Sequence, residues 1–297
     1  MIGKTKLFIS SYSYRWAMGC RQYRPLNPMP IKEFLAKAKG HGLDGIQIVD
    51  NVNPENLTQK ECKEIFAIAQ KLGIELQWGF EGWEENKIDR LLEICSMTEA
   101  KLLRGVFGKN FFQDRISQQK RINKAISKLS ELLPKLEKRR IILAIENHFD
   151  LKIFELMEVI KKVNHPLVKI CLDTTNALAE IEKPLNTVKA LGPFSTSMHF
   201  KDFAISKVVG GYTIMGRPIG EGQQGCQEIL RKALEINPNI EVCIELSIIK
   251  PEDASTMLEQ EESWVKNSVK NTKEYLNNIY SDFIENRDKK SGNLYHS

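Results

Sequence analysis

Four short apolar segments in the second half of the chain each end in a side chain that can bind a metal ion: Glu146, Asp173, His199 and Glu245. Three carboxylates gathered at one point would repel one another unless a cation neutralised them. Any one of these residues alone is more simply a hydrogen-bonded group at a strand end. The prediction of a metal site rests on finding all four at the ends of consecutive strands. Oxygen donors with one imidazole nitrogen suit one divalent ion as cofactor, and Mn²⁺, Mg²⁺, Co²⁺ and Zn²⁺ all fit.

These segments belong to a repeating pattern of strand-like and helix-like segments. Apolar stretches rich in β-branched residues lie near residues 6, 45, 74, 101, 141, 168, 194 and 241. Segments of helical period separate them, over residues 31–39, 54–72, 87–97, 117–138, 151–162, 184–191, 227–236 and 252–280. Asn53 and Pro54 predict the start of the second of these helices.

Strict alternation of strands and helices predicts a parallel sheet covered by helices. Eight such units in 297 residues favour the α/β class and a closed (β/α)8 TIM barrel. A doubly wound open sheet is the alternative, and no glycine-rich dinucleotide motif follows the first strand to support it. We expect a single barrel domain over residues 1–284 and a polar tail over residues 285–297. In such a barrel the C-terminal ends of the strands carry the site, which is where the four candidate ligands lie.

The composition argues against some classes of function. The chain is 42% hydrophobic and 27% charged, with a net charge of only +5. Because basic residues exceed acidic ones by only a few and are spread along the chain, a nucleic acid or a membrane is a poor candidate for its partner. The six cysteines include no CxxC pair and several lie in apolar segments, which indicates a reducing compartment. Since the N-terminus lacks the apolar core of a signal peptide, we expect a cytoplasmic protein.

Five segments together resemble the xylose isomerase-like barrel superfamily: IENH, LDTTNAL, HFKD, PIGEG and IEL. They occur in this order at barrel spacing, and the resemblance covers nearly the whole chain. The superfamily includes sugar and sugar phosphate isomerases and epimerases, and also the endonuclease IV group. For this chain the resemblance implies that Glu146 and Glu245 both bind the metal and serve as the acid/base pair. It implies that Asp173 and His199 are ligands only.

The resemblance also implies roles for residues around the metal. Residues expected to contact substrate oxygens are His148, Lys201 and Arg217, and residues expected to orient the ligands are Asn147, Asn176 and Asp202. For Lys201 and Asp202 a solvated ion pair is an equally good interpretation. The glycine-rich segment 210–225 fits a lid over the substrate and equally a plain long turn.

An aromatic run, SYSYRWAMG, follows the first predicted strand. Within it, Tyr12 and Trp16 are candidates for the floor of a sugar pocket, because aromatic rings offer flat apolar faces. The alternative, that these rings simply plug the mouth of the barrel, is at least as good.

The chemistry that the resemblance implies is proton transfer beside a carbonyl. A divalent ion would polarise the carbonyl of a small carbohydrate, a glutamate would remove the neighbouring proton, and the ion would stabilise the resulting enediolate. Partial burial would raise the pKa of such a glutamate, whereas the charge of the ion would lower it. We therefore expect a metal-dependent isomerase or epimerase of a sugar or sugar phosphate.

Other functions fit the same residues. The aromatic run, with HFKDFAI and GYTIMGRPIGEG, also resembles the 3-oxo-isoapionate decarboxylases of the superfamily, so a decarboxylase of a 3-oxo sugar acid is the alternative. Such an enzyme needs a cation for the substrate carboxylate, for which Arg15, Lys201 and Arg217 are candidates. A non-catalytic sugar-binding barrel is disfavoured by the intact ligand set. An endonuclease is disfavoured by only five histidines. The long helices are compatible with a homodimer or homotetramer.

Overall fold

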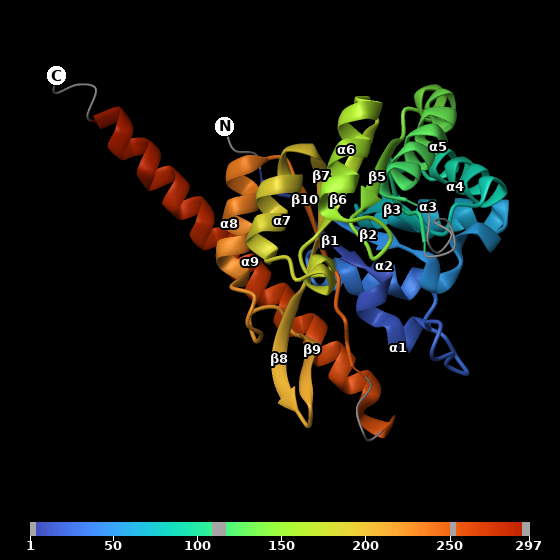
Figure 1. Ribbon diagram of the computed structural model, residues 1–297. Coiled ribbons are helices and arrows are strands. Elements are labelled where there is room, and N and C mark those ends of the chain that lie inside the picture. The colour runs from blue at the N-terminus through green and yellow to red at the C-terminus, as the bar shows by residue number, and fades with distance from the viewer. Residues whose placement is uncertain (1–3, 109–116, 250–253, 293–297) are drawn as a thin grey trace.

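The computed structural model describes residues 4–108, 117–249 and 254–292. Eight parallel strands close into a barrel in the order β1-β10-β7-β6-β5-β4-β3-β2 (Figure 1). They are β1 (Leu7–Ser10), β2 (Gly45–Ile48), β3 (Glu75–Glu81), β4 (Leu102–Val106), β5 (Ile142–Glu146), β6 (Val168–Asp173), β7 (Ser195–Phe200) and β10 (Glu241–Ile244). The single-domain TIM barrel predicted from the sequence is confirmed, and each strand lies where an apolar segment predicts one.

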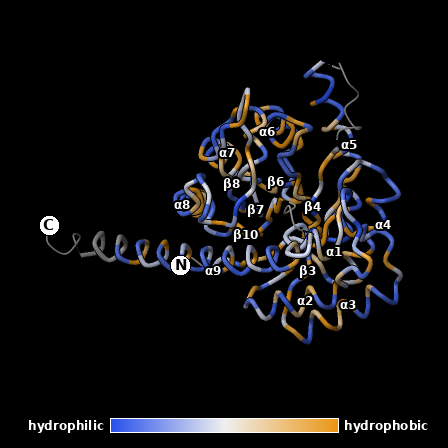
Figure 2. Tube along the Cα trace, turned by 90° about the horizontal axis from the view of Figure 1, so that it is seen from below, coloured by the Kyte–Doolittle hydropathy of each residue, from blue (hydrophilic) through white to orange (hydrophobic). Residues whose placement is uncertain are grey.

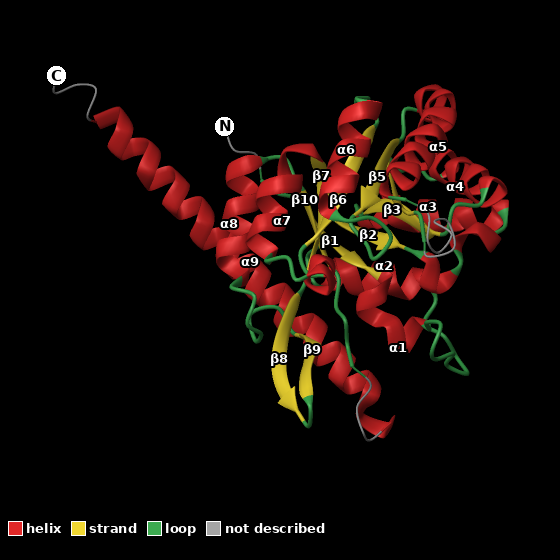
Figure 3. Cartoon of the chain, in the orientation of Figure 1, coloured by secondary structure: helices red, strands yellow, loops and turns green. Residues whose placement is uncertain are grey.

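Helices surround the barrel on the outside (Figure 3). They are α1 (Arg15–Met18), α2 (Ile31–Gly40), α3 (Gln59–Leu72), α4 (Glu85–Met97), α5 (Gln118–Arg139), α6 (Ile153–Val163), α7 (Pro184–Leu191), α8 (Cys226–Ile236) and α9 (Met257–Gly292). A helix does begin at Pro54 with Asn53 as its N-cap, but it is the short 3-10 helix η3 (Pro54–Asn56). The long α-helix predicted from Pro54 begins later, at Gln59, where Thr58 and Glu61 form a capping box. Among the described helices, none is both long and apolar enough to cross a bilayer.

The last helix is longer than the sequence suggests. α9 continues past residue 280 to Gly292, and its C-terminal part extends away from the barrel as an isolated rod (Figure 2). It thus includes the first part of the polar segment 285–297, whose residues 293–297 lie outside the described part. The boundary expected at residue 284 stays a prediction.

The register of the strands brings the four candidate ligands to one rim of the barrel. Asp173, at the end of β6, lies opposite His199 on β7. Glu245 follows β10 directly, and its backbone N–H donates to the carbonyl of Phe200 at 3.2 Å. Glu146 ends β5, which pairs with β6. Because all eight strands run parallel, these four strand ends meet at the same face.

A two-stranded antiparallel hairpin projects from the barrel and was not predicted (Figure 1). Its strands are β8 (Asp202–Val208) and β9 (Gly211–Arg217). β9 takes up residues 211–217 of the segment 210–225, for which the sequence suggested a lid or a long turn, and β8 lies before that segment. Gly210, in the connection, has a φ of 79°, a left-handed conformation that glycine adopts without strain.

The start of α9 is anchored to the loop after β1 through Glu261. The carboxylate of Glu261 accepts hydrogen bonds from the backbone N–H of Trp16 at 2.7 Å and of Ala17 at 3.0 Å. Its side chain is buried, and this burial raises its pKa from 4.5 to about 7, although the two N–H donors oppose the shift. The folded protein therefore holds a proton at Glu261 more tightly than the unfolded chain does.

We expect this carboxyl to make folding less favourable as pH rises between about 4.5 and 7. Below this range Glu261 is protonated in both states, and above it the folded state must bury a charge. Glu261→Gln removes the effect. The unfolding free energy of the variant, minus that of the wild type, should therefore rise by up to about 3 kcal/mol from pH 5 to pH 8. Urea unfolding at both pH values measures the difference, and parallel pH curves for the two proteins would refute it.

Candidate metal centre

Glu146, Asp173, His199 and Glu245 form one buried cluster, as the sequence predicts. Each offers a donor atom, and these four atoms all lie within 4.8 Å of one another. Nδ1 of His199 lies 3.2 Å from Oε2 of Glu146, 3.2 Å from Oε2 of Glu245 and 3.8 Å from Oδ2 of Asp173. None of the four residues is more than 5% exposed. Three carboxylates and an imidazole are therefore held together out of solvent.

Two of the donor atoms have no hydrogen-bond partner in the described part of the chain: Oδ2 of Asp173 and Nδ1 of His199. The ammonium of Lys201 forms an ion pair with Oδ2 of Asp173 at 2.6 Å, so of the two atoms it is Nδ1 of His199 that is left with carboxylates around it. Buried polar atoms are normally satisfied, because leaving one unpaired costs about 1–3 kcal/mol. An imidazole nitrogen without a hydrogen bond, surrounded by three carboxylates, is a set of atoms that a divalent ion would satisfy. The cluster thus fits a metal site.

Nearby cations keep both glutamates ionised. Burial alone would raise the pKa of Glu146, but the charges of Arg104 and His199 outweigh it and lower that pKa below its usual value. Burial of Glu245 is likewise outweighed, here by His199 and Lys201, and its pKa is lowered. The raised pKa that burial suggested for these glutamates is therefore not present. Both side chains are thereby held as carboxylates, the form that binds a cation.

Arg104 is a component of the site that the sequence analysis missed. It lies on β4, is 4% exposed, and its Nε lies 2.5 Å from Oε2 of Glu146. Its Nη1 contacts Oδ1 of Asp50 at 3.3 Å and donates to the carbonyl of Phe80 at 3.1 Å. The hydroxyl of Tyr12 in turn donates to Asp50 at 3.0 Å. Tyr12 therefore belongs to a polar network that ends at Glu146, and a direct contact with substrate stays a prediction.

Lys201 lies inside the cluster rather than on its edge. Its Nζ is 2.6 Å from Oδ2 of Asp173 and 2.6 Å from Oε2 of Glu245, and the residue is 7% exposed. The interpretation of Lys201 and Asp202 as a solvated pair is therefore wrong. Asp202 points elsewhere and accepts hydrogen bonds from the backbone N–H groups of Gly220 and Gly222, both at 2.9 Å, which shape the loop after β9.

Two asparagines hold the ligands in place. Asn147 brackets the backbone of Asp173: its Oδ1 accepts from the N–H at 2.7 Å and its Nδ2 donates to the carbonyl at 3.0 Å. Asn176 donates from Nδ2 to Oε1 of Glu146 at 2.8 Å, and from its backbone N–H to Oδ1 of Asp173 at 2.8 Å. A further contact, missed from the sequence, is Ser10, whose hydroxyl donates to Oε1 of Glu245 at 2.8 Å.

The contacts of the other residues predicted to bind substrate are with residues outside the cluster of four candidate ligands. His148 is partly buried, and its ring packs edge-on against Phe149. Arg217 sits at the root of the hairpin and donates to the carbonyl of Gly216 at 3.1 Å. Trp16 is 5% exposed and packs edge-on against Tyr23. Substrate binding by these residues stays a prediction.

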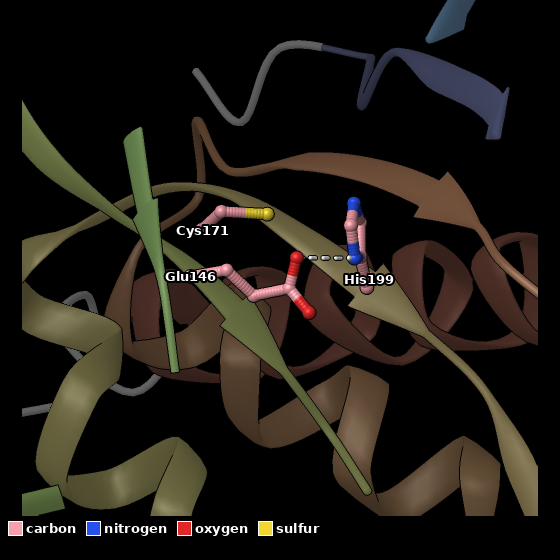
Figure 4. Close-up of side chains that lie close together, drawn as sticks. All are labelled: Glu146, Cys171 and His199. Carbon is pink, nitrogen blue, oxygen red and sulfur yellow. Dashed lines mark ion pairs between the residues drawn. The ribbon is translucent and has the colours of Figure 1, made fainter. Parts of the chain in front are cut away.

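A thiol lies beside the same cluster. Figure 4 shows Cys171 of β6 next to the carboxylate of Glu146 and the imidazole of His199. These three residues also offer donor atoms within 4.8 Å of one another. The site therefore presents two overlapping ligand sets, one of oxygen and nitrogen donors alone and one with sulfur.

A cavity of about 570 Å³ lies at the same end of the barrel, beyond the ends of β3 and β4. Its walls include the stacked rings of Trp83 and Phe107, with centroids 4.8 Å apart, and the charged Arg21, Glu81 and Lys124. The volume suits a small molecule. Aromatic faces beside charged groups suit a ligand that has both apolar and hydroxyl-bearing surfaces.

Comparison with known proteins agrees with this architecture. The chain is 24% identical over 263 residues to the 3-oxo-isoapionate decarboxylase of Pectobacterium atrosepticum, which covers 88% of the chain and 92% of that protein. Its fold matches D-psicose 3-epimerase from Clostridium cellulolyticum with a TM-score of 0.69 at 15% identity, over 92% of this chain and 99% of the epimerase. A xylose isomerase-like barrel from Mycobacterium smegmatis, solved with magnesium, matches with a TM-score of 0.66 at 16% identity, over 91% and 98% of the two chains.

The sequence profile of the xylose isomerase-like TIM barrel family matches residues 35–274. This match covers most of the chain and every strand from β2 to β10. With a closed barrel and a buried carboxylate–histidine cluster at its C-terminal face, the chain belongs to the xylose isomerase-like TIM barrel family.

Proposed function

We propose that this protein is a divalent-metal-dependent isomerase or epimerase of a small sugar or sugar phosphate. The observation that carries the proposal is the position of Glu146 and Glu245, which are both ionised and lie 3.2 Å from Nδ1 of His199. Two carboxylates at one centre can serve in turn as proton acceptor and proton donor.

Glu146, Asp173, His199 and Glu245 would hold the metal. When bound, the ion supplies Lewis-acid polarisation of a substrate carbonyl. One glutamate then accepts the proton from the carbon beside that carbonyl. If the other glutamate returns a proton to the same carbon from the opposite face, the result is epimerisation.

Return of the proton to the neighbouring carbon gives aldose–ketose isomerisation instead. Arg104 keeps the carboxylate of Glu146 in one orientation during either reaction, through its contact at 2.5 Å. Lys201 adds a positive charge beside Asp173 and Glu245, where negative charge on a substrate oxygen would be stabilised.

Decarboxylation of a 3-oxo sugar acid is the second candidate, and the decarboxylase relative from Pectobacterium favours it, since it aligns over 88% of the chain. Loss of CO₂ from a 3-oxo acid leaves the same kind of negative oxygen that Lys201 and the ion would stabilise. The reaction also needs a cation to hold the substrate carboxylate. Arg15, Lys201 and Arg217 are the candidates. Arg15 donates to Oε1 of Gln22 at 3.2 Å, Arg217 donates to the carbonyl of Gly216, and Lys201 already pairs with Asp173 and Glu245.

One experiment separates the two reactions. Purified protein with Mn²⁺ is offered ketoses and 3-oxo sugar acids in D₂O. Deuterium incorporated into a sugar that keeps its carbon skeleton supports the isomerase or epimerase, and release of CO₂ supports the decarboxylase. If every ketose stays free of deuterium while a 3-oxo acid loses CO₂, the first proposal is wrong.

The two overlapping ligand sets predict different spectra for the cobalt form. We expect Co²⁺ to bind the three carboxylates and the imidazole, because these four donors outnumber the three of the set that includes Cys171. The Co²⁺ protein should then show only weak visible bands. An intense near-ultraviolet sulfur-to-cobalt band that disappears in Cys171→Ser would show that sulfur binds instead.

A further inference from the structure

A chain of three hydrogen bonds leads from His199 through the interior of the barrel to its opposite end. Nε2 of His199 lies 2.7 Å from Oε1 of Gln47 on β2. Nε2 of Gln47 donates to Oε1 of Gln77 on β3 at 3.0 Å. Nε2 of Gln77 donates to Oε2 of Glu241, at the start of β10, at 2.7 Å. The chain therefore connects the metal centre to the N-terminal end of the barrel.

Packing alone does not account for two amides in this position. Gln47 is fully buried and Gln77 is 4% exposed. A buried amide that lost its partner would cost about 1–3 kcal/mol, so apolar side chains would fill the space with less risk to stability. The two amides are therefore better explained by the groups that they connect, His199 at one end and Glu241 at the other.

The direction of every hydrogen bond in the chain follows from Glu241. A carboxylate only accepts, so Gln77 must turn its NH₂ group toward Glu241 and its carbonyl toward Gln47. Gln47 must then turn its NH₂ group toward Gln77 and its carbonyl toward His199. A carbonyl also only accepts, so Nε2 of His199 must carry a proton in both the charged and the neutral imidazole. In the neutral form, which a metal ligand must be, the lone pair is then on Nδ1, the atom that faces the carboxylates.

We propose that Glu241 is a positioning residue that acts through Gln77 and Gln47 to set the tautomer of His199 for metal binding. The inference rests on the proposed metal centre and names residues outside the ligand set. A ligand histidine commonly donates its second N–H to a carboxylate or carbonyl, which fixes its orientation. Here two amides extend that connection across the barrel. Burial and the charge of Glu75 raise the pKa of Glu241, and Lys6, with Nζ 3.9 Å from Oε1 of Glu241, opposes that rise.

The affinity of the full-length protein for Mn²⁺, measured from the electron paramagnetic resonance signal of the free ion, tests this role. Gln47→Leu removes the acceptor at His199 and should raise the Kd by about 10- to 100-fold. Glu241→Gln should also raise the Kd, because a glutamine there can donate or accept and no longer sets the direction of the chain. A reversed chain would turn an NH₂ group toward His199 and place the proton on Nδ1.

A double variant distinguishes positioning from simple structural support. Gln77→Glu with Glu241→Gln moves the carboxylate one step along the chain at constant net charge. The new carboxylate again forces Gln47 to turn its carbonyl toward His199, so the Kd should return toward the wild-type value. A purely structural role predicts the opposite, since the double variant buries the charge more deeply. Ser197→Ala is the matched control, because Ser197 is buried on β7 and its hydroxyl has no partner in the described structure.

The outcomes test the hydrogen-bond chain and the metal centre separately. A wild-type Kd in Glu241→Gln, or a double variant no better than that single variant, would overturn the role of the chain and leave the metal centre intact. A wild-type protein that binds no Mn²⁺ would overturn the metal centre and this inference with it. Weakened binding in Gln47→Leu and Glu241→Gln, recovery in the double variant and a wild-type Kd in Ser197→Ala would support the inference.

Discussion

Glu245→Gln is expected to lower turnover by 10²- to 10⁴-fold, the usual contribution of a general acid or base, with the fold retained. Glutamine matches glutamate in shape and can still accept the hydrogen bond that Ser10 donates at 2.8 Å. It cannot take up a proton, and it provides no charge for Lys201 or for a divalent ion. Initial rates on the substrate identified by deuterium or CO₂ measurements give the effect.

Two controls accompany this variant. Glu93→Gln changes a glutamate on the surface of α4 whose ion pair in the described part of the chain is with Arg90, and it should leave the rates unchanged. Mn²⁺ affinity of Glu245→Gln should fall as well, which provides a measurement independent of turnover. Wild-type rates and affinity in Glu245→Gln would remove Glu245 from both the metal centre and the proton transfer.

Arg104→Leu is expected to have the largest effect on stability. The substitution leaves Glu146 and Asp50 buried without their shared cation, and breaking a buried ion pair in this way costs about 3–5 kcal/mol. A divalent ion would replace part of the lost charge, so Mn²⁺ should stabilise the variant more than it stabilises the wild type. Urea unfolding with EDTA and with Mn²⁺ measures both quantities.

Arg104→Lys is the matched variant for this test. It keeps the positive charge but loses the planar fork that contacts Glu146, Asp50 and Phe80 together, so its stability should lie between the other two. If Arg104→Leu unfolded within about 1 kcal/mol of the wild type in EDTA, the carboxylates would not depend on the guanidinium, contrary to the cost expected for a broken buried pair.

The parts of the fold that repeat were predictable from the sequence. Alternating apolar and helical segments predict the eight strands, and barrel topology then places the ends of β5, β6, β7 and β10 at one rim. That is why Glu146, Asp173 and His199 could be grouped before any distance was known. The order of the strands alone brings these candidate ligands together, so their proximity can be predicted without knowing how side chains pack.

The polar residues inside the barrel were not predictable in the same way. Barrel strands are buried on both faces, so no alternation of polar and apolar residues shows which side chains point inward. In the sequence, the interior polar residues occur only as single polar positions within apolar segments: Arg104 in LLRGV, Gln47 in GIQI and Gln77 in ELQWGFE. Their contacts depend on the tilt and stagger of neighbouring strands, which a single segment does not encode.

The hairpin was missed for a different reason. The segment from Asp202 to Arg217 holds a Gly-Gly pair between stretches of β-forming residues, which is itself a hairpin signal. Glycines are equally typical of a loop, and nothing in the sequence of the extended stretches on either side shows that they pair with each other. The exposure of Ile205 and Ile214, 44% and 48%, also removes the burial pattern that identifies a barrel strand.

The order of the strands places Glu245, the last of the four candidate ligands, at the seam where the chain's first and last barrel strands meet. β10 closes the barrel by pairing with β1, and Ser10 at the end of β1 then reaches Glu245. During synthesis, Glu146, Asp173 and His199 emerge from the ribosome well before Glu245 does. A chain cut before β10 lacks the fourth candidate ligand, so full-strength metal binding at the proposed metal centre would require a closed barrel.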